Sequence, residues 1–242
     1  MPLLKRNPLT VASLFKITAM TAARKTLIFD LNGTMINDME YHISAWTEIL
    51  NQDLKAGMTY EQIKNQMYGK NSELFIRVFG EGKMTEKEMD FWSMEKEKRY
   101  QKNYRPHLQL IDGLADFLKI AHENNIPMAI GSAAIPFNID FVLDQLDIRK
   151  YFTAIVSADD VAVSKPHPET FLKAARLLNT KPADCLVFED APKGVEAAKN
   201  AGIPCVVITT LHSPNDFPAS DHIVRFIKDY SDPFILSLTP KA

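Results

Sequence analysis

Short apolar runs alternate with amphipathic stretches along most of the chain. Five of these runs are continuous and apolar, as is typical of strands buried on both faces of a parallel sheet: 26–31, 128–131, 154–157, 185–189 and 205–209. Between them, stretches such as 168–178 repeat their apolar residues at helical spacing. The alternation predicts an α/β fold, with a doubly wound parallel sheet covered by helices on both faces.

Residues 37–105 break this alternation, because their pattern is helical throughout. Two segments match the capping-box pattern that begins a helix, Thr59 with Gln62 and Thr85 with Glu88. A crossover between parallel strands needs only about a dozen residues, and this stretch is several times longer. We therefore expect a Rossmann-like core of residues 26–36 and 106–242, and a helical cap domain of residues 37–105.

The bulk composition excludes several classes of protein. The chain has 242 residues and a formal net charge of -2, which argues against binding nucleic acid or an anionic membrane by charge alone. No window approaches the roughly 18 uncharged apolar residues of a membrane span. Cys185 and Cys205 both stand in apolar runs, as buried cysteines of a reducing compartment do. We expect a cytoplasmic protein that is a monomer by default.

Residues 1–25 carry Lys5, Arg6, Lys16, Arg24 and Lys25 and no acidic residue. Their apolar run is too weak for a signal peptide. We expect a poorly ordered basic extension, or a true start at Met20, and exclude this segment from the fold prediction.

Polar residues follow the predicted strands at the point where each strand ends. In an open parallel sheet, ligands bind beyond these carboxyl ends. Each residue alone has an ordinary explanation as part of a turn or a helix start, but together they form a site: Asp30, Ser132, Lys165, Glu189 and Asp190. Three carboxylates suggest a divalent cation with oxygen ligands, and the lysine suggests a phosphate.

The same residues carry a family resemblance. Four segments, in this order and spacing, resemble the haloacid dehalogenase superfamily in the branch with a helical cap inserted after the first strand: 29–34 (FDLNGT), 130–134 (IGSAA), 164–169 (SKPHPE) and 187–194 (VFEDAPKG). Tyr41-His42 with Ala45-Trp46 is similar to the start of the cap in β-phosphoglucomutases and related sugar-phosphate phosphatases.

The resemblance implies a role for each residue. Asp30 would attack phosphorus and form an aspartyl phosphate. Mg²⁺ would be held by Asp30, the main-chain carbonyl of Asn32, Asp190 and Glu189, the last directly or through water. The transferring phosphoryl group would be held by Ser132 and Lys165, with Gly33, Thr34 and Ala133 beside it. Substrate choice would fall to cap residues, for which we name His42, Trp46, Lys70 and Asn71.

One residue departs from the family pattern. Phosphatases and mutases of the family carry aspartate where this chain has Asn32, and that acid transfers protons to the leaving alcohol and from the attacking water. An amide cannot do this, and general acid–base help is worth about 10²–10⁴-fold. Three explanations stay open: leaving groups that need no acid or a proton relay through His42, an introduced change that traps a complex, or drift towards binding without catalysis.

These observations rank three functions. Hydrolysis of a small phosphorylated metabolite, in particular a sugar phosphate, comes first. A β-phosphoglucomutase-like phosphoryl transfer comes second, because a mutase needs a cation for a second phosphate and Lys70 lacks the bidentate fork of arginine. A non-catalytic phosphate-binding protein comes third.

Overall fold

A computed structural model describes residues 26–239, so the expectations for residues 1–25 lie outside the described residues. Its centre is a parallel sheet with the strand order β3-β2-β1-β4-β5-β6. The strands are β1 (Thr26–Phe29), β2 (Met128–Gly131), β3 (Ala154–Val156), β4 (Cys185–Glu189), β5 (Cys205–Ile208) and β6 (Ile223–Ile227). The two central strands, β1 and β4, pair in parallel from Thr26 opposite Cys185 to Phe29 opposite Phe188. The predicted α/β parallel-sheet fold is confirmed.

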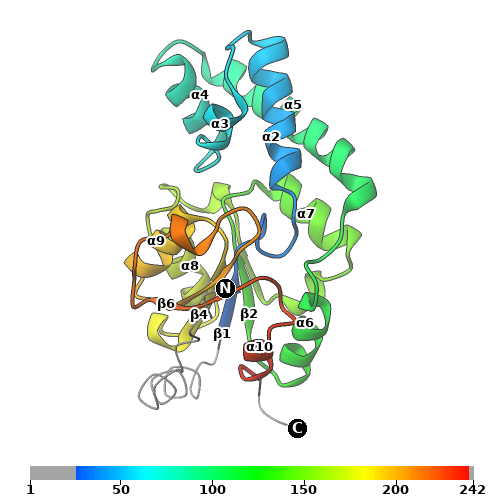
Figure 1. The fold of residues 1–242 in the computed structure, drawn as a ribbon, viewed down its shortest axis with the longest axis vertical. Coiled ribbons are helices and arrows are strands. Elements are labelled where there is room, and N and C mark those ends of the chain that lie inside the picture. Colours follow the sequence, from blue (N-terminus) through cyan, green and yellow to red (C-terminus); the bar gives the residue numbers. More distant parts are fainter. Residues whose placement is uncertain (1–25, 240–242) are drawn as a thin grey trace, which may run out of the picture.

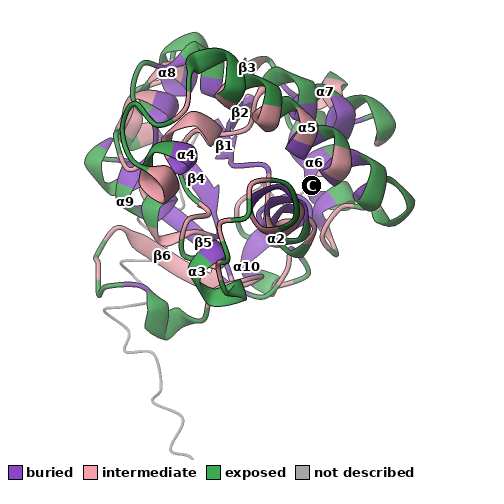
Figure 2. Ribbon diagram, turned by 90° about the horizontal axis from the view of Figure 1, so that it is seen from above, coloured by how far each residue is buried: buried purple, intermediate pink, exposed green. Residues whose placement is uncertain are grey.

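Helices cover both faces of this sheet (Figure 1). One face carries α6 (Leu114–Glu123), α7 (Pro136–Gln145) and α10 (Pro233–Leu236), and the other carries α8 (Glu169–Leu177) and α9 (Pro192–Asn200). In β1, Leu27 and Phe29 point into the first layer and Ile28 points into the second, as the two-residue period of a strand requires. Seen from above in Figure 2, the inner strands β1, β2, β4 and β5 are buried, whereas the half-buried β6 lies at the edge of the molecule.

The chain between β1 and α6 forms a separate group of helices beyond the carboxyl ends of the strands (Figure 1). These are α2 (Met39–Thr47), which continues as a π-helical segment Glu48–Asp53, then α3 (Tyr60–Lys64), α4 (Asn71–Phe79) and α5 (Glu86–Tyr104). We call this group the cap. The capping boxes predicted at Thr59 and Thr85 are both present. The cap has an apolar cluster of its own, in which Trp46 packs edge-on against Phe75 with ring centroids 5.3 Å apart.

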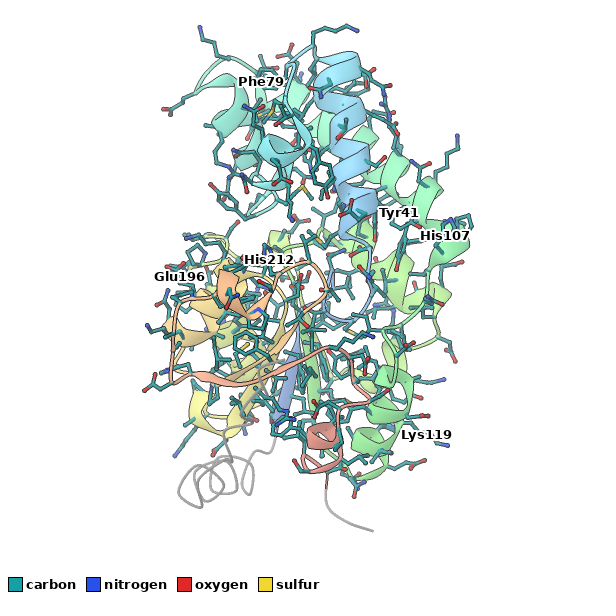
Figure 3. All side chains as sticks on the ribbon, in the orientation of Figure 1. Tyr41, Phe79, His107, Lys119, Glu196 and His212 are labelled. Carbon is teal, nitrogen blue, oxygen red and sulfur yellow. The ribbon has the colours of Figure 1, made fainter. Side chains whose placement is uncertain are left out.

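The chain enters and leaves the cap on one side of the molecule. Figure 3 shows Tyr41, near the start of α2, beside His107, just after α5, and their ring centroids lie 5.5 Å apart. Tyr41 also packs on Tyr104 at 4.7 Å. Aromatic contacts therefore join the two chain segments that connect the cap to the core.

The sequence prediction missed β6 at the edge of the sheet. This strand is only half-buried and carries Arg225 at its centre, so it lacks the continuous apolar run of the inner strands. Its backbone pairs with β5 through a register shift between Cys205 and Val206. Among residues 26–239, no helix combines the length and the apolar character that crossing a bilayer requires.

Candidate active site

Asp30 lies directly after β1, at the centre of the sheet's carboxyl edge. Its backbone N–H donates to the carbonyl of Phe188, which continues the pairing of β1 with β4 by one residue. The side chain is 7% exposed and lines a cavity of about 560 Å³ between the sheet and the cap. A carboxylate at this position therefore faces a cavity large enough for a small organic ligand.

Lys165 joins the acids of two neighbouring strand ends. Its Nζ donates to Asp30 Oδ1 at 2.6 Å and to Glu189 Oε1 at 2.9 Å. The ammonium also lies over the ring of Phe171, 4.6 Å from its centroid. The side chain is buried, and although burial opposes its charged form, the two carboxylates raise the pKa of Lys165 above its ordinary value. The lysine is thus a fixed cation at the floor of the cavity.

Glu189 is the last residue of β4 and Asp190 follows it, and local backbone geometry fixes both. Glu189 Oε2 accepts the N–H groups of Asp190 and Ala191, each at 2.8 Å. Asp190 Oδ1 accepts from the hydroxyl of Thr34 at 3.0 Å. Gly33 has a φ of 73° and lies so close to Asp190 that any Cβ at residue 33 would collide with this carboxylate. Gly33 therefore permits both the turn and the approach of the acid.

Asp30, Glu189 and Asp190 form a cluster in which one carboxylate oxygen from each lies within 4.8 Å of the others. Burial and the charge of Glu189 raise the pKa of Asp30 to about 7, against the effect of Lys165. The same two causes raise the pKa of Asp190 well above its ordinary value. Three carboxylates and one ammonium leave two negative charges uncompensated when all are ionised. A divalent cation with oxygen ligands would neutralise them, so this donor set fits such an ion.

The residues predicted for the phosphate site fall into two groups. Ser132 follows β2, where its N–H donates to the carbonyl of Val156 and its hydroxyl accepts from the N–H of Ala134 at 3.1 Å. Ser132 and Ala133 line the cavity together with Asp30 and Lys165. Gly33 and Thr34 do not line it; they are buried behind Asp190. Ser132, Ala133 and Lys165 therefore face the cavity, whereas Gly33 and Thr34 do not.

The four cap residues singled out in the sequence all line the cavity. Trp46 is 2% exposed and also belongs to the cap's apolar cluster. Lys70 Nζ donates to the carbonyl of Val161 in the core at 2.8 Å, and Asn71 Nδ2 donates to Glu97 Oε1 at 2.7 Å. His42 is buried, contrary to the exposed position that is ordinary for a histidine on a polar helix edge.

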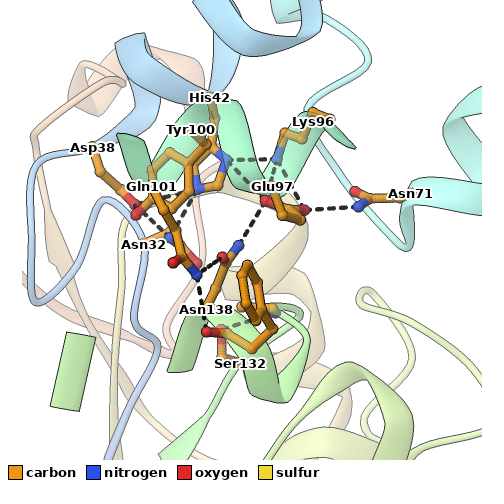
Figure 4. A network of polar contacts seen from close by, with 12 residues as sticks. Asn32, Asp38, His42, Asn71, Lys96, Glu97, Tyr100, Gln101, Ser132 and Asn138 are labelled. Carbon is orange, nitrogen blue, oxygen red and sulfur yellow. Dashed lines mark hydrogen bonds and ion pairs between the residues drawn. The ribbon is translucent and has the colours of Figure 1, made fainter. Parts of the chain in front are cut away.

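Sequence reasoning missed a buried polar network that connects the cap to the core (Figure 4). Lys96 Nζ contacts both oxygens of Glu97 and lies 2.6 Å from His42 Nδ1. Glu97 Oε2 also accepts from Asn138 Nδ2 of α7 at 2.7 Å. Asp38, completely buried at the start of α2, accepts from Asn32 Nδ2. The only sequence signal was the charged run 95–99 on α5, which alone does not show which of its members are buried.

These features define a class: a parallel α/β core whose strand ends carry an acidic, lysine-bridged site under a helical cap. The family model described as haloacid dehalogenase-like hydrolase matches residues 27–208. The chain belongs to this family, as the resemblance in the sequence implied.

Two curated relatives span most of the chain. Fructose-1-phosphate phosphatase YqaB of Escherichia coli is 31% identical over 76% of this chain and 96% of its own length. The β-phosphoglucomutase of Bacillus subtilis is 34% identical over 74% of this chain and 80% of its own length. Among solved structures, a family IA hydrolase from Entamoeba histolytica superimposes with a TM-score of 0.77 at 21% identity, covering 88% of this chain and 99% of its own. At 21% identity, this structural similarity shows the fold alone.

Proposed function

We propose that the protein is a Mg²⁺-dependent phosphatase that hydrolyses a small phosphorylated metabolite, in particular a sugar phosphate, through an aspartyl phosphate on Asp30. The observation that carries this proposal is the bond from Lys165 to the buried Asp30 at the floor of the cavity. The lysine gives the site affinity for an oxyanion, and the carboxylate beside it is the group that can attack phosphorus. The names of the two curated relatives support the substrate class.

The chain's own residues fit the two steps. The Asp30 carboxylate attacks phosphorus, the bond from phosphorus to the ester oxygen breaks, and the alcohol leaves with a proton taken from solvent. Water then attacks phosphorus and gives up one proton to solvent, the bond to Asp30 breaks, and inorganic phosphate leaves. Lys165 and Ser132 hold the phosphoryl oxygens in both steps, and the cap of residues 37–105 excludes bulk water.

Asp30, Asp190 and the main-chain carbonyl of Asn32 would hold Mg²⁺. Both oxygens of Glu189 already have partners, Lys165 on one and two N–H groups on the other, so Glu189 would act on the ion through water rather than as a direct ligand. Bound there, Mg²⁺ would stabilise negative charge on the phosphoryl oxygens.

The cavity supports hydrolysis over transfer between two phosphorylated positions. A bisphosphate needs a cation at the far end of the cavity from Asp30. Of the lysines that line the described cavity besides Lys165, Lys70 contacts the Val161 carbonyl, Lys96 contacts Glu97, and Lys193 contacts Glu196. No arginine lines it. Each of these three lysines therefore already has a hydrogen-bond or ion-pair partner within the protein.

A panel of phosphate monoesters in Mg²⁺ tests this function, with Asp30→Asn as the matched control. We expect phosphate release from hexose monophosphates that is lost in the control and lost on chelation of the metal. Conversion of β-glucose 1-phosphate to glucose 6-phosphate faster than phosphate release would instead establish a mutase. Absence of both activities, with phosphate binding retained, would establish a binding protein.

A further inference from the structure

Asn32 and Asp38 are in direct contact, although five residues lie between them in the chain. Asn32 Nδ2 donates to Asp38 Oδ2 at 2.5 Å (Figure 4). The neighbouring Gly33 N–H donates to the other oxygen, Oδ1, at 3.1 Å. A backbone bridge between Asn32 and Ile36 closes the turn that brings residue 38 back towards residue 32. Position 32 thus has no carboxylate of its own, but the carboxylate of Asp38 lies against its side chain.

Asp38 has further partners on α5 and α2. Tyr100 of α5 donates its hydroxyl to Oδ2 at 2.5 Å, and His42 Nε2 of α2 lies 3.2 Å from the same oxygen. Burial opposes the charged form of Asp38, but His42, Tyr100 and Asn32 outweigh it and lower its pKa. The side chain is 0% exposed and does not line the cavity, so it cannot touch a substrate. Its action on the reaction must pass through a neighbour.

His42 is held by partners on both sides of its ring. A lysine ammonium has only donors, so Nδ1, which lies 2.6 Å from Lys96 Nζ, is the acceptor. Nε2 lies 3.2 Å from Asp38 Oδ2 and 3.0 Å from Asn32 Nδ2. Both ring nitrogens are engaged within the protein. This arrangement weighs against a relay in which His42 itself hands a proton to the substrate.

The side chain at position 32 is therefore dictated by Asp38. Because a carboxylate only accepts hydrogen bonds, the atom of residue 32 that faces it must be a donor. Asparagine supplies that donor. An aspartate of the same shape would place a carboxylate oxygen against Asp38 Oδ2, where two like charges repel each other.

We propose that Asn32 and Asp38 are a matched pair, in which Asp38 is a positioning residue for the side chain at 32 and an acid works at 32 only when residue 38 is uncharged. Asn32 then belongs to the native sequence together with Asp38, and it is not an isolated loss of the acid at position 32. This inference rests on the proposed phosphatase function, because the consequence of the pair is measured in that reaction.

A double-mutant cycle tests the pair, using the full chain, Asn32→Asp, Asp38→Asn and the variant with both changes. The double variant exchanges donor and acceptor and keeps one carboxylate between the two positions. We expect kcat of the double variant to exceed kcat of Asn32→Asp by at least about 10-fold, a conservative share of what general acid–base catalysis supplies. Asn32→Asp combined with Asp116→Asn, a change on the exposed side of α6, is the control and should behave as Asn32→Asp alone.

Two further readouts separate positioning from a purely structural effect. The dependence of kcat/KM on the pKa of the leaving group, measured with substituted phenyl phosphates, should flatten in the double variant only, because only there does an acid serve the leaving group. The melting temperature should fall in Asn32→Asp and recover in the double variant. If Asp38→Asn alone does not fold, the comparison of Asn32→Asp with the double variant carries the test.

The outcomes distinguish this inference from the proposed function. If Asn32→Asp alone raises kcat as much as the double change does and keeps its melting temperature, the two positions are independent and the inference is wrong. If phosphate release by the wild type persists in Asp30→Asn, the proposed function itself fails. A wild type that depends on Asp30, with coupled effects at 32 and 38, supports both.

Discussion

Lys165 and Asp30 stand on different segments of the core, and the lysine Nζ donates to Asp30 Oδ1 at 2.6 Å. Because the same ammonium also binds Glu189, it holds the ends of β1 and β4 in one charged group. In the proposed mechanism, a phosphate dianion that enters the cavity would meet this cation beside the carboxylate that attacks it. The relationship would give Lys165 two roles, orientation of the nucleophile and stabilisation of charge in transfer.

Removal of this charge should therefore affect the reaction far more than removal of a surface charge. For Lys165→Met we expect kcat/KM to fall by about 10²–10³-fold, the range found when a preorganised electrostatic group is deleted. Lys193→Gln is the matched control, because Lys193 lines the same cavity but is 48% exposed and paired with Glu196. Steady-state kinetics with one hexose monophosphate gives both values, and a change below 3-fold in Lys165→Met would contradict the assigned role.

Mg²⁺ should stabilise the folded protein through the acidic cluster. Binding to the native state at about 100 times the Kd adds about 2.7 kcal/mol to the free energy of unfolding. We expect the melting temperature to rise with Mg²⁺ in the wild type and in Asp159→Asn, whose side chain is exposed at the cavity, and not in Asp190→Asn. Differential scanning calorimetry measures this. An equal rise in Asp190→Asn would place the metal elsewhere.

Glu97 should make the free energy of unfolding depend on pH in the acid range. Burial opposes its ionisation, but Lys96, His42, Asn71 and Asn138 outweigh this and lower its pKa from 4.5 to about 2. An acid whose pKa is lower in the folded protein than in the unfolded protein stabilises the fold at pH values above its unfolded pKa. This contribution is lost as the pH falls towards the folded pKa. We therefore expect the contribution, on the order of 3 kcal/mol, to be complete above about pH 4.5 and to vanish as the pH falls to about 2.

The difference in unfolding free energy between the wild type and Glu97→Gln measures this contribution. Urea denaturation at a series of pH values gives the difference, which should shrink as the pH falls. Glu123→Gln, on an exposed part of α6, is the control and should stay within about 0.5 kcal/mol of the wild type throughout. A difference for Glu97→Gln that does not change with pH would show that the carboxylate is not held ionised by the network.

The sequence predicts the parts of this structure that depend on local pattern. The inner strands are continuous apolar runs, so β1, β4 and β5 could be placed to within two residues. Asp30, Lys165 and Asp190 were predicted to meet because parallel strands end at one edge. The edge strand β6 was not predicted, since its half-exposed positions and Arg225 remove the apolar signal.

The cap–core network could not be predicted, because it depends on packing between distant segments. Asp38 is buried by Tyr100, 62 residues away, and Glu97 is bonded to Asn138, 41 residues away. In the sequence, Asp38 looks like an ordinary acid before a helix, and Glu97 is one member of a solvated charge run. The lone asparagine at position 32 could be recognised as a departure from the family, but its partner became visible only in the folded chain.

The measurement that tests the central claim most directly is the chemical trapping of phosphorus on Asp30. The protein is mixed with a ³²P-labelled hexose monophosphate and Mg²⁺, quenched in acid, and digested for peptide mapping. The account predicts a label on the peptide that contains Asp30, removed by hydroxylamine as an acyl phosphate is, and absent from Asp30→Asn. Phosphate release without any label on this peptide, or with full activity in Asp30→Asn, would contradict it.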